Sequence, residues 1–273
     1  MVGGIQAIIY FNLLMTPDSR LSNIDFWLLT VITILIAASG YVINDYYDAS
    51  IDKINKPQKW IAGNSWSLPT VKNLYISIIT IGAIISVYLA IKLNLLTWLF
   101  LYPFAIGGLW VYSYKLKCMP FVGNLWVAIF CAAVIAIVAV PDWLFDNKQV
   151  IRQELWVYML FAFMSTLYRE IIKDLEDEAG DKIAQCKTFV VRFGLHRGKI
   201  LALTLGAILL ALLLWWDSGL HNNTVHVGML ILQGAIVGSM ALLWWAKDHT
   251  YFHHASSLVK VVMLIGTGLL LII

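Results

Sequence analysis

Residues 26–52 read FWLLTVITILIAASGYVINDYYDASID, an uncharged hydrophobic segment that runs directly into three aspartates. Its first 19 residues, 26–44, carry no charge. A helix needs about 20 predominantly apolar residues to cross the hydrocarbon core of a bilayer. The stretch therefore predicts a membrane-spanning helix that ends in acidic side chains.

Hydrophobic segments of this kind recur along the whole chain of 273 residues. Hydrophobic residues make up 60% of the sequence and charged residues 13%, whereas soluble domains contain about 45–50% and about 25%. This composition excludes an ordinary soluble domain, and a net charge of only +3 gives no sign of a nucleic-acid partner. We predict an all-α polytopic membrane protein, one domain over residues 1–273, with about nine transmembrane helices around a central cavity. The predicted segments, of which the first is short, are 3–15, 25–43, 70–91, 95–113, 121–140, 155–172, 199–216, 226–246 and 257–273.

Lysine and arginine are distributed unevenly between the two sides of this predicted bundle. Of the 19 basic residues, 15 lie in one set of alternate connections and four in the other. Cytoplasmic loops carry an excess of Lys and Arg, so the first set is predicted to be cytoplasmic. The long connections 44–69 and 173–198 belong to that set. We expect an integral membrane protein, of the cell inner membrane, with its active site facing the cytoplasm.

These two connections carry acidic motifs of equal spacing, NDYYDASIDKINKP at 44–57 and YREIIKDLEDEAGDK at 168–182. The aspartates stand at offsets 0, 3 and 7, as Asp45, Asp48 and Asp52 in the first motif and Asp174, Asp177 and Asp181 in the second. Residues at this spacing share one face of a helix, where like charges repel. Oxygen ligands without Cys or His favour Mg²⁺, which binds through one or two carboxylates together with substrate phosphates. The motifs therefore predict a Mg²⁺-dependent site for a phosphate-bearing substrate.

Basic side chains accompany both motifs. Lys56 and Lys59 follow the first motif, Lys187 and Arg192 follow the second, and Lys117 lies on the same predicted side. Such cations can neutralise a diphosphate leaving group.

Two other classes of protein share part of this pattern. A cation transporter also places acids among membrane helices, but usually near the midplane and on broken helices. Here the acids lie at loop edges beside lysines, which would repel a cation that arrived without an anionic substrate. A non-catalytic membrane scaffold is the other alternative, and its acidic motifs should tolerate alanine.

Cysteine and histidine give weaker indications. Cys118, Cys131 and Cys186 form no C-x-x-C pair, so neither a disulfide framework nor a zinc site is expected. His249 and His253 fall in the predicted loop before the last segment, where we expect interfacial side chains rather than metal ligands.

The paired motifs resemble those of the UbiA superfamily of intramembrane prenyltransferases. The resemblance covers nearly the whole chain, including the predicted helices, both Asp-rich loops and a Tyr/Lys element after the fourth helix. Asn44 and the first three aspartates match the first family motif, and the other three aspartates match the second, with Glu170 one turn earlier. The family's Y-x-x-K element matches Tyr114 to Lys117, with Tyr112 also available. In KPQKWIAGNS, residues 56–65, lysines stand where the family commonly has arginines.

This resemblance implies a transferase that joins an allylic prenyl chain to an acceptor. It implies two Mg²⁺ ions that bridge the diphosphate to the six aspartates. The residues expected to contact the substrates are Asn44, Lys56, Lys59, Tyr112, Tyr114, Lys117, Glu170 and Lys187. The second motif is most similar to that of the branch that prenylates geranylgeranylglyceryl phosphate. An aromatic acceptor, 4-hydroxybenzoate or dihydroxynaphthoate in quinone synthesis, remains the alternative.

Overall fold

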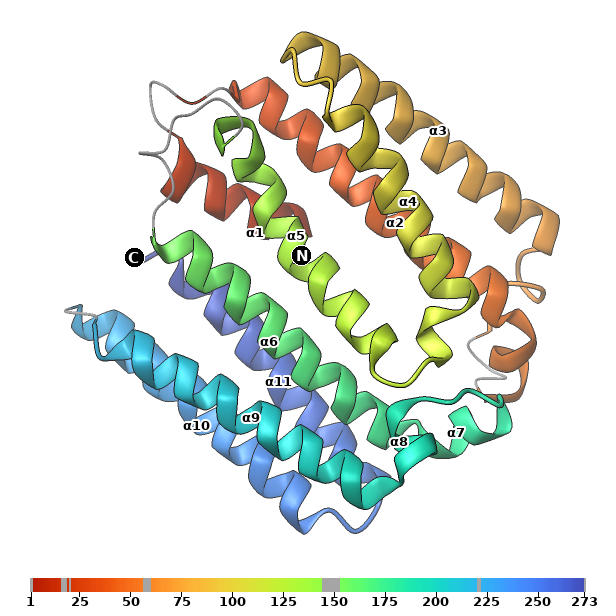
Figure 1. Ribbon diagram of the computed structural model, residues 1–273, viewed down its shortest axis with the longest axis vertical. Helices are drawn as coiled ribbons and strands as arrows, with labels where there is room; N and C mark the ends of the chain where they lie inside the picture. The colour runs from red at the N-terminus through yellow and green to blue at the C-terminus, as the bar shows by residue number, and fades with distance from the viewer. Residues whose placement is uncertain are drawn as a thin grey trace. The chain divides into compact units, whose positions relative to one another are not determined.

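The computed structural model describes residues 2–15, 19, 21–55, 60–143, 153–219 and 222–272, and within these ranges it contains helices, turns and no strand (Figure 1). The α-helices are α1 (Val2–Ile9), α2 (Asn23–Asn55), α3 (Leu68–Lys92), α4 (Trp98–Tyr114), α5 (Val122–Trp143), α6 (Gln153–Glu176), α7 (Glu178–Ile183), α8 (Phe189–Phe193), α9 (Leu195–Asp217), α10 (Asn223–Trp245) and α11 (His249–Leu269). A π-helical turn (Tyr10–Leu14) follows α1, and a 3₁₀ turn (Leu116–Cys118) follows α4.

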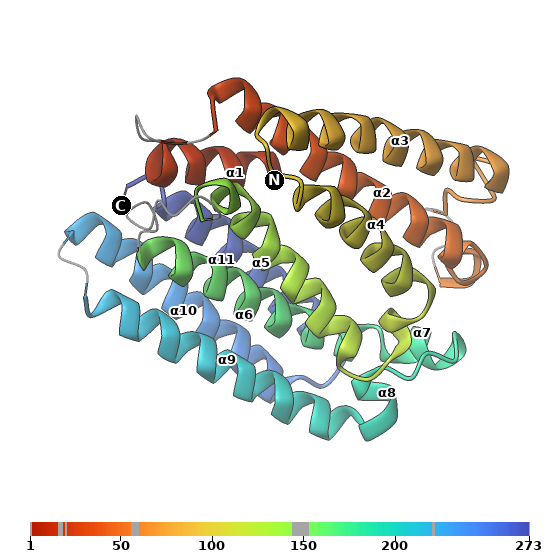
Figure 2. The ribbon, with the colours of Figure 1, turned by 45° about the horizontal axis from the view of Figure 1, so that its top comes forward.

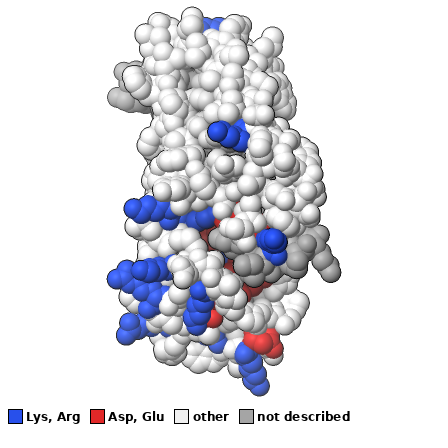
Figure 3. Space-filling view, turned by 90° about the vertical axis from the view of Figure 1, so that its right-hand side faces the viewer, with Lys and Arg blue, Asp and Glu red and all other residues white. Residues whose placement is uncertain are grey.

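Seven of these helices are long and apolar enough to cross a membrane, namely α2, α3, α5, α6, α9, α10 and α11. Helix α4 has 17 residues, which is about 25 Å at 1.5 Å per residue. The apolar helix over Val2–Leu14 is shorter still. The predicted all-α membrane fold with a short first helix is therefore confirmed, and the count of nine is approximate. Figure 3 shows a face with wide uncharged areas, as lipid-facing surface requires, and one region where Lys and Arg side chains gather.

The chain divides into two compact units, and each is described by itself. The first contains residues 1–10, 14–117 and 137–150, and the second contains residues 11–13, 118–136 and 151–273. In the first unit α2 packs against α3 and α4, α3 also packs against α4, and α1 lies against α2 (Figure 2). In the second unit α6, α9, α10 and α11 form a ring in which each helix packs against two others (Figure 1).

A small residue brings two helices of the first unit into close contact. At Gly82 on α3, an added Cβ would lie 2.4 Å from the hydroxyl oxygen of Tyr102 on α4. That hydroxyl donates a hydrogen bond to the carbonyl oxygen of Ile79, at 2.7 Å. Membrane helices associate through such small residues and interhelical hydrogen bonds because lipid supplies no hydrophobic driving force between them.

A polar contact lies inside the apolar core of the second unit. Tyr168 on α6 is fully buried. Its hydroxyl lies 2.8 Å from that of Ser239 on α10, so the buried phenol keeps a hydrogen-bond partner, as burial away from water demands. This packing fixes the rotation of α6 about its axis, and α6 carries the start of the second acidic motif.

Two helix boundaries differ most from the predicted ones. Helix α2 continues to Asn55, so half of the predicted loop 44–69 is helical and the first acidic motif lies on an unbroken helix. Helix α11 begins at His249 rather than at residue 257. Asp248 caps it, accepting a hydrogen bond from the backbone N–H of Thr250 at 2.9 Å. A capping side chain satisfies an otherwise unpaired N–H and extends the helix into a polar stretch that hydropathy alone assigns to a loop.

Candidate active site

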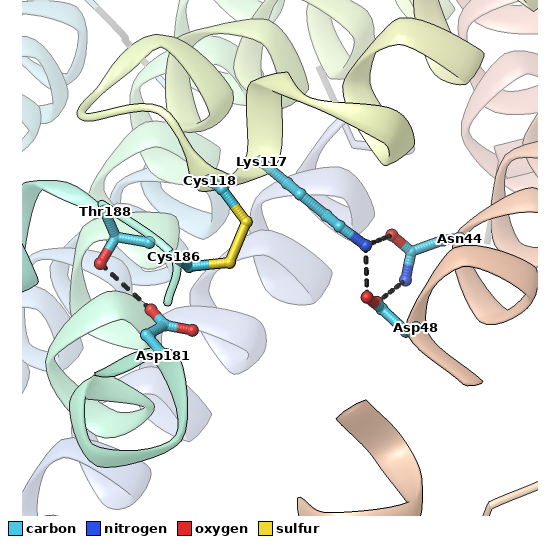
Figure 4. Close-up of a disulfide and its surroundings, with 7 residues drawn as sticks. All are labelled: Asn44, Asp48, Lys117, Cys118, Asp181, Cys186 and Thr188. Atoms are coloured by element: carbon cyan, nitrogen blue, oxygen red, sulfur yellow. Dashed lines mark hydrogen bonds and ion pairs between the residues drawn. A yellow bond between two sulfur atoms is a disulfide. The ribbon is translucent and has the colours of Figure 1, made fainter. Parts of the chain in front are cut away.

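The first acidic motif forms a three-residue polar cluster in the first unit (Figure 4). Asn44 and Asp48 lie one turn apart on α2, and the Asn44 amide donates to a carboxylate oxygen of Asp48 at 2.8 Å. The ammonium of Lys117 forms an ion pair with Asp48 and lies 3.3 Å from the Asn44 carbonyl oxygen. The Lys117 and Asp48 side chains are only 17% and 20% exposed. The structure thus brings together three of the residues that the sequence predicts for the site.

Four other predicted residues lie on α2 and α4. Asp45 and Asp52 are half-buried on α2, and Tyr112 is half-buried on α4. Tyr114 lies in an aromatic cluster, with its ring stacked on Trp110 and 5.6 Å from the ring of Tyr47, and it is 62% exposed. Lys56 and Lys59 lie outside the described residues.

The second acidic motif spans a bend between two helices of the second unit. Asp174 lies near the end of α6, and Asp181 lies on α7. Asp177 stands between them with φ −93° and ψ 4°, outside helical geometry. The backbone nevertheless continues to bond as a helix through the bend, from the N–H of Asp177 to the Lys173 carbonyl at 2.8 Å and from the N–H of Asp181 to the Asp177 carbonyl at 2.9 Å. The predicted single carboxylate stripe is therefore bent at its middle aspartate.

Asn124 is a partner of this motif that sequence reasoning missed. It lies in the first turn of α5, is 8% exposed, and donates a hydrogen bond from its amide to a carboxylate oxygen of Asp174 at 3.1 Å. A hydrogen-bond donor fixes the orientation of the half-buried Asp174 carboxylate. Residues that contact metal ligands position those ligands in the same way. An asparagine opening a hydrophobic segment on the predicted motif side was the only signal for it in the sequence.

Thr188 holds the last aspartate of the motif. Its hydroxyl donates to a carboxylate oxygen of Asp181 at 3.1 Å (Figure 4). The backbone N–H of Cys186 donates to the Asp181 carbonyl at 2.9 Å. Lys187, predicted to contact substrate, has an exposed side chain in the same loop. The segment after α7 therefore folds back onto the acidic motif.

Glu170 has a charged neighbour within the predicted span. The guanidinium of Arg169 contacts a carboxylate oxygen of Glu170 at 2.9 Å, and the two side chains are 21% and 14% exposed. The Nε atom of Arg169 is buried without a hydrogen-bond partner. Ionisable side chains in membrane helices are costly and pair with one another, and they usually mark functional positions.

His249 and His253 join α11 to the end of α6. The Nδ1 atom of His249 lies 2.9 Å from the Glu176 carbonyl oxygen, and that of His253 lies 2.8 Å from the Glu176 carboxylate. Both partners are acceptors, so each Nδ1 carries the hydrogen. The two histidines, expected in a loop, lie on a helix and cap the end of α6.

The spacing of the cysteines predicts no disulfide framework, and this prediction is wrong for one pair. Cys118 and Cys186 form a disulfide in the second unit, with their Cα atoms 4.5 Å apart and 68 residues between them in sequence (Figure 4). Cys131 is free. A disulfide between cysteines this far apart in sequence is set by the tertiary structure, and no local motif indicates it.

The charges of these clusters define what the arrangement can bind. Over the residues that the structure describes, no three His, Cys, Asp or Glu side chains lie close enough to hold a metal ion alone. Carboxylates paired with Lys117 and Asn124 instead offer partial sites, which a ligand that brings its own oxygen atoms completes. A multiply charged phosphate is one ligand of this kind.

The chain matches the model of a known protein family over most of its length. The family model described as the UbiA prenyltransferase family matches residues 6–257. The chain belongs to the UbiA prenyltransferase family. The resemblance to this family that the acidic motifs indicate is thereby confirmed.

Curated relatives within the UbiA family carry one name. The chain is 36% identical over 181 residues to digeranylgeranylglyceryl phosphate synthase of Methanobrevibacter smithii, a match that covers 65% of this chain and 62% of that protein. It is 38% identical over 180 residues to the synthase of Saccharolobus solfataricus, covering 66% and 59%. The matches thus span about six tenths of these two relatives. A longer match, 31% identical over 268 residues, covers 93% of this chain and 89% of the synthase of Methanosphaera stadtmanae.

Solved structures share the UbiA fold. One, from work on the biosynthesis of digeranylgeranylglyceryl phosphate synthase in membranes, has a TM-score of 0.71 at 21% identity and covers 99% of this chain and 91% of its own. A UbiA homolog from Archaeoglobus fulgidus, bound to GPP and Mg²⁺, has a TM-score of 0.62 at 16% identity and covers 98% and 94%. At these identities the likeness shows the fold.

Proposed function

We propose that this chain is a Mg²⁺-dependent intramembrane prenyltransferase. It moves a prenyl group from an isoprenoid diphosphate to a lipid acceptor that resembles geranylgeranylglyceryl phosphate. The observation that carries the proposal is the cluster of Asn44, Asp48 and Lys117 at the end of an apolar helix in a member of the UbiA family. An amide, a carboxylate and an ammonium in contact supply ligands of both signs for a diphosphate and its cation.

The chain's own residues act on the donor in the following way. Asp48 and the other aspartates supply carboxylate oxygens for a cation, and Lys117 supplies hydrogen bonds to diphosphate oxygens. The ion pair of Lys117 with Asp48 orients both side chains before the donor arrives. Apolar helix walls exclude water from the allylic carbon, so that the acceptor rather than water attacks it.

The donor set fits Mg²⁺. The carboxylates of both motifs are hard oxygen ligands with no Cys or His in either motif, and Asn124 orients Asp174 as a positioning residue does. Bound Mg²⁺ supplies Lewis-acid assistance to the departure of diphosphate. We include in the proposal the use of two ions, which the family resemblance implies.

The names of the curated relatives favour a lipid acceptor over an aromatic one. The curated proteins with the matches described above are named digeranylgeranylglyceryl phosphate synthase. A cation transporter is disfavoured by the ion pair of Lys117 with Asp48, because an ammonium on the carboxylate repels a bare cation.

The proposed orientation places both acidic motifs at the cytoplasmic side of the inner membrane. It rests on the 15 of 19 lysines and arginines that lie in one set of connections. The charged diphosphate would then reach the site from the cytoplasmic side, and the prenyl tail would remain among the helices or in the bilayer.

Replacing Lys117 by alanine should weaken donor binding more than acceptor binding. A charge-assisted hydrogen bond contributes about 1.5–3 kcal/mol, so the KM for prenyl diphosphate should rise about 10- to 100-fold while that for the acceptor changes little. Initial rates at varied donor and acceptor measure both constants. Lys115→Ala removes an exposed lysine two residues away and is the matched control. A larger rise in the acceptor KM would reassign Lys117 to the acceptor.

Replacing Asn124 by alanine should raise the Mg²⁺ requirement. Residues that orient a metal ligand typically contribute 10- to 100-fold to metal affinity or activity, so we expect about a tenfold increase in the half-saturating Mg²⁺ concentration. A titration of initial rate against Mg²⁺ measures it. Asn124→Asp tests geometry, since it keeps the size but replaces the donor by a second carboxylate. An unchanged Mg²⁺ requirement in Asn124→Ala would contradict the positioning role.

An acceptor panel tests the proposed substrate class. Purified protein in detergent receives geranylgeranyl diphosphate and Mg²⁺, with geranylgeranylglyceryl phosphate, 4-hydroxybenzoate or dihydroxynaphthoate in separate reactions, and products are identified by mass. We expect an ether product with the glyceryl phosphate. An aromatic product instead would place the chain among the quinone-forming enzymes.

A further inference from the structure

Cys118 and Cys186 are held together by more than their own bond. The backbone N–H of Lys187 donates to the carbonyl oxygen of Cys118 at 3.0 Å. The N–H of Cys186 is itself fixed by the Asp181 carbonyl, at 2.9 Å. The Cα atoms of the two cysteines are 4.5 Å apart, within the usual range for a disulfide. These hydrogen bonds do not require the sulfur–sulfur bond, so the two thiols would remain neighbours in the reduced protein.

Each cysteine adjoins a residue of the proposed site. Cys118 directly follows Lys117, whose ammonium pairs with Asp48. Cys186 precedes Lys187 and bonds to the backbone of Asp181. Closing the disulfide therefore fixes the peptide next to Lys117 and the loop next to the second acidic motif (Figure 4).

The two cysteine residues differ in exposure. Cys186 is 8% exposed, whereas Cys118 is half-buried in the 3₁₀ turn after α4. A small reagent thus meets Cys118 first, and Cys186 stands behind it as the resolving thiol. A reactive cysteine poised beside a resolving one is the usual arrangement of a thiol that senses oxidants.

We propose that Cys118 and Cys186 form a reversible oxidation site that controls donor binding, with a low-molecular-weight disulfide such as oxidised glutathione as its co-reactant. The inference rests on the proposed function and on the cytoplasmic placement of this loop. Cytosolic thiol pools keep most cysteines reduced, so the pair is a dithiol in the resting cell and a disulfide when the pool becomes oxidised.

The reaction proceeds by two thiol–disulfide exchanges. The thiolate of Cys118 attacks one sulfur of the small disulfide and expels a thiolate, which leaves a mixed disulfide. The thiolate of Cys186 then attacks the Cys118 sulfur and expels the second thiolate. Two cysteine thiols lose two protons and two electrons, and one small disulfide gains them to become two small thiols.

Oxidation should weaken the binding of prenyl diphosphate. Lys117 has to leave Asp48 to reach the diphosphate, and the closed disulfide restrains the peptide that joins Lys117 to Cys118. The dithiol leaves this turn with fewer restraints. We therefore expect the oxidised protein to have a KM for the donor roughly tenfold higher, the loss of about one charge-assisted hydrogen bond, with a smaller change in the acceptor KM.

The test uses the full chain in detergent, reduced by dithiothreitol or oxidised by excess oxidised glutathione. Denaturation and maleimide labelling, read by intact mass, should count three free cysteines in the reduced form and only Cys131 in the oxidised form. Trypsin cleavage after Lys187 should be slower in the oxidised form. Donor KM values are then measured for both forms. Cys118→Ser and Cys186→Ser should abolish the response, whereas the matched control Cys131→Ser should keep it.

The outcomes separate the oxidation site from the proposed prenyl transfer. Three labels in both forms, or a disulfide that leaves the donor KM unchanged, would overturn the proposal. A response that survives in Cys118→Ser would also overturn it. Absence of prenyl transfer in both forms would count against the proposed function alone, since label count and cleavage rate still decide whether the pair closes and restrains the loop.

Discussion

Replacing Asp48 by alanine is expected to lower kcat/KM for prenyl transfer by about 100-fold or more. Asp48 contacts both other residues of its cluster, since it pairs with Lys117 and accepts a hydrogen bond from Asn44. Alanine removes a proposed metal ligand and leaves the half-buried ammonium without its carboxylate. Loss of one preorganised electrostatic group at a reacting centre typically costs about 10²–10³ in rate. Initial rates of product formation, read by mass, measure the effect.

Asp25→Asn is the matched control for this variant. Asp25 lies on the same helix, α2, and also pairs with a lysine, Lys92, at 2.5 Å, but at the other end of the helix. Thermal unfolding of both variants in detergent separates lost activity from lost fold. We expect Asp25→Asn to retain activity. The control also shows whether the assay can resolve a threefold difference in activity. If it can, activity of Asp48→Ala within about threefold of the parent would exclude Asp48 from the site.

Replacing Asp174 by alanine is expected to lower kcat/KM by about 100-fold or more, for the same reason in the second motif. Asp174 is oriented by Asn124 from α5, at 3.1 Å, just before the bend at Asp177. Because Asn124 acts through Asp174, the double variant with Asn124→Ala should be no less active than Asp174→Ala alone. Residues that act as a unit show this non-additivity.

Glu176→Gln is the control for Asp174. It changes a carboxylate two residues away on the same helix, whose partner His253 belongs to α11. We expect its activity to stay close to that of the parent. Additive losses in the double variant would mean that Asn124 and Asp174 contribute separately, and near-normal activity of Asp174→Ala would exclude that carboxylate from metal binding.

Hydrophobic periodicity and charge were enough to predict the helices of this fold, because lipid requires long apolar segments. All nine predicted segments coincide with helices of the structure, although α4 and the first one are short. The spacing of aspartates also placed the first motif on one helix face, since α2 is unbroken to Asn55. Membership of the UbiA family follows from the same motifs.

The remaining features depend on tertiary contacts that spacing does not encode. The partner of Asp174 comes from Asn124, 50 residues away, and the Cys118–Cys186 pair joins residues 68 apart. In each case two polar or sulfur groups meet because packed apolar helices carry them there, and the local sequence around either group gives no sign of the other.

The most direct test of the account is the stoichiometry of one Mg²⁺-dependent reaction. Purified protein receives geranylgeranyl diphosphate and geranylgeranylglyceryl phosphate with Mg²⁺, with EDTA, and with EDTA followed by excess Mg²⁺, while ether product and released diphosphate are quantified together. The account predicts equal amounts of product and diphosphate with Mg²⁺, neither with EDTA, and full recovery when Mg²⁺ is restored. Diphosphate released without ether product, or transfer that continues in EDTA, would contradict it.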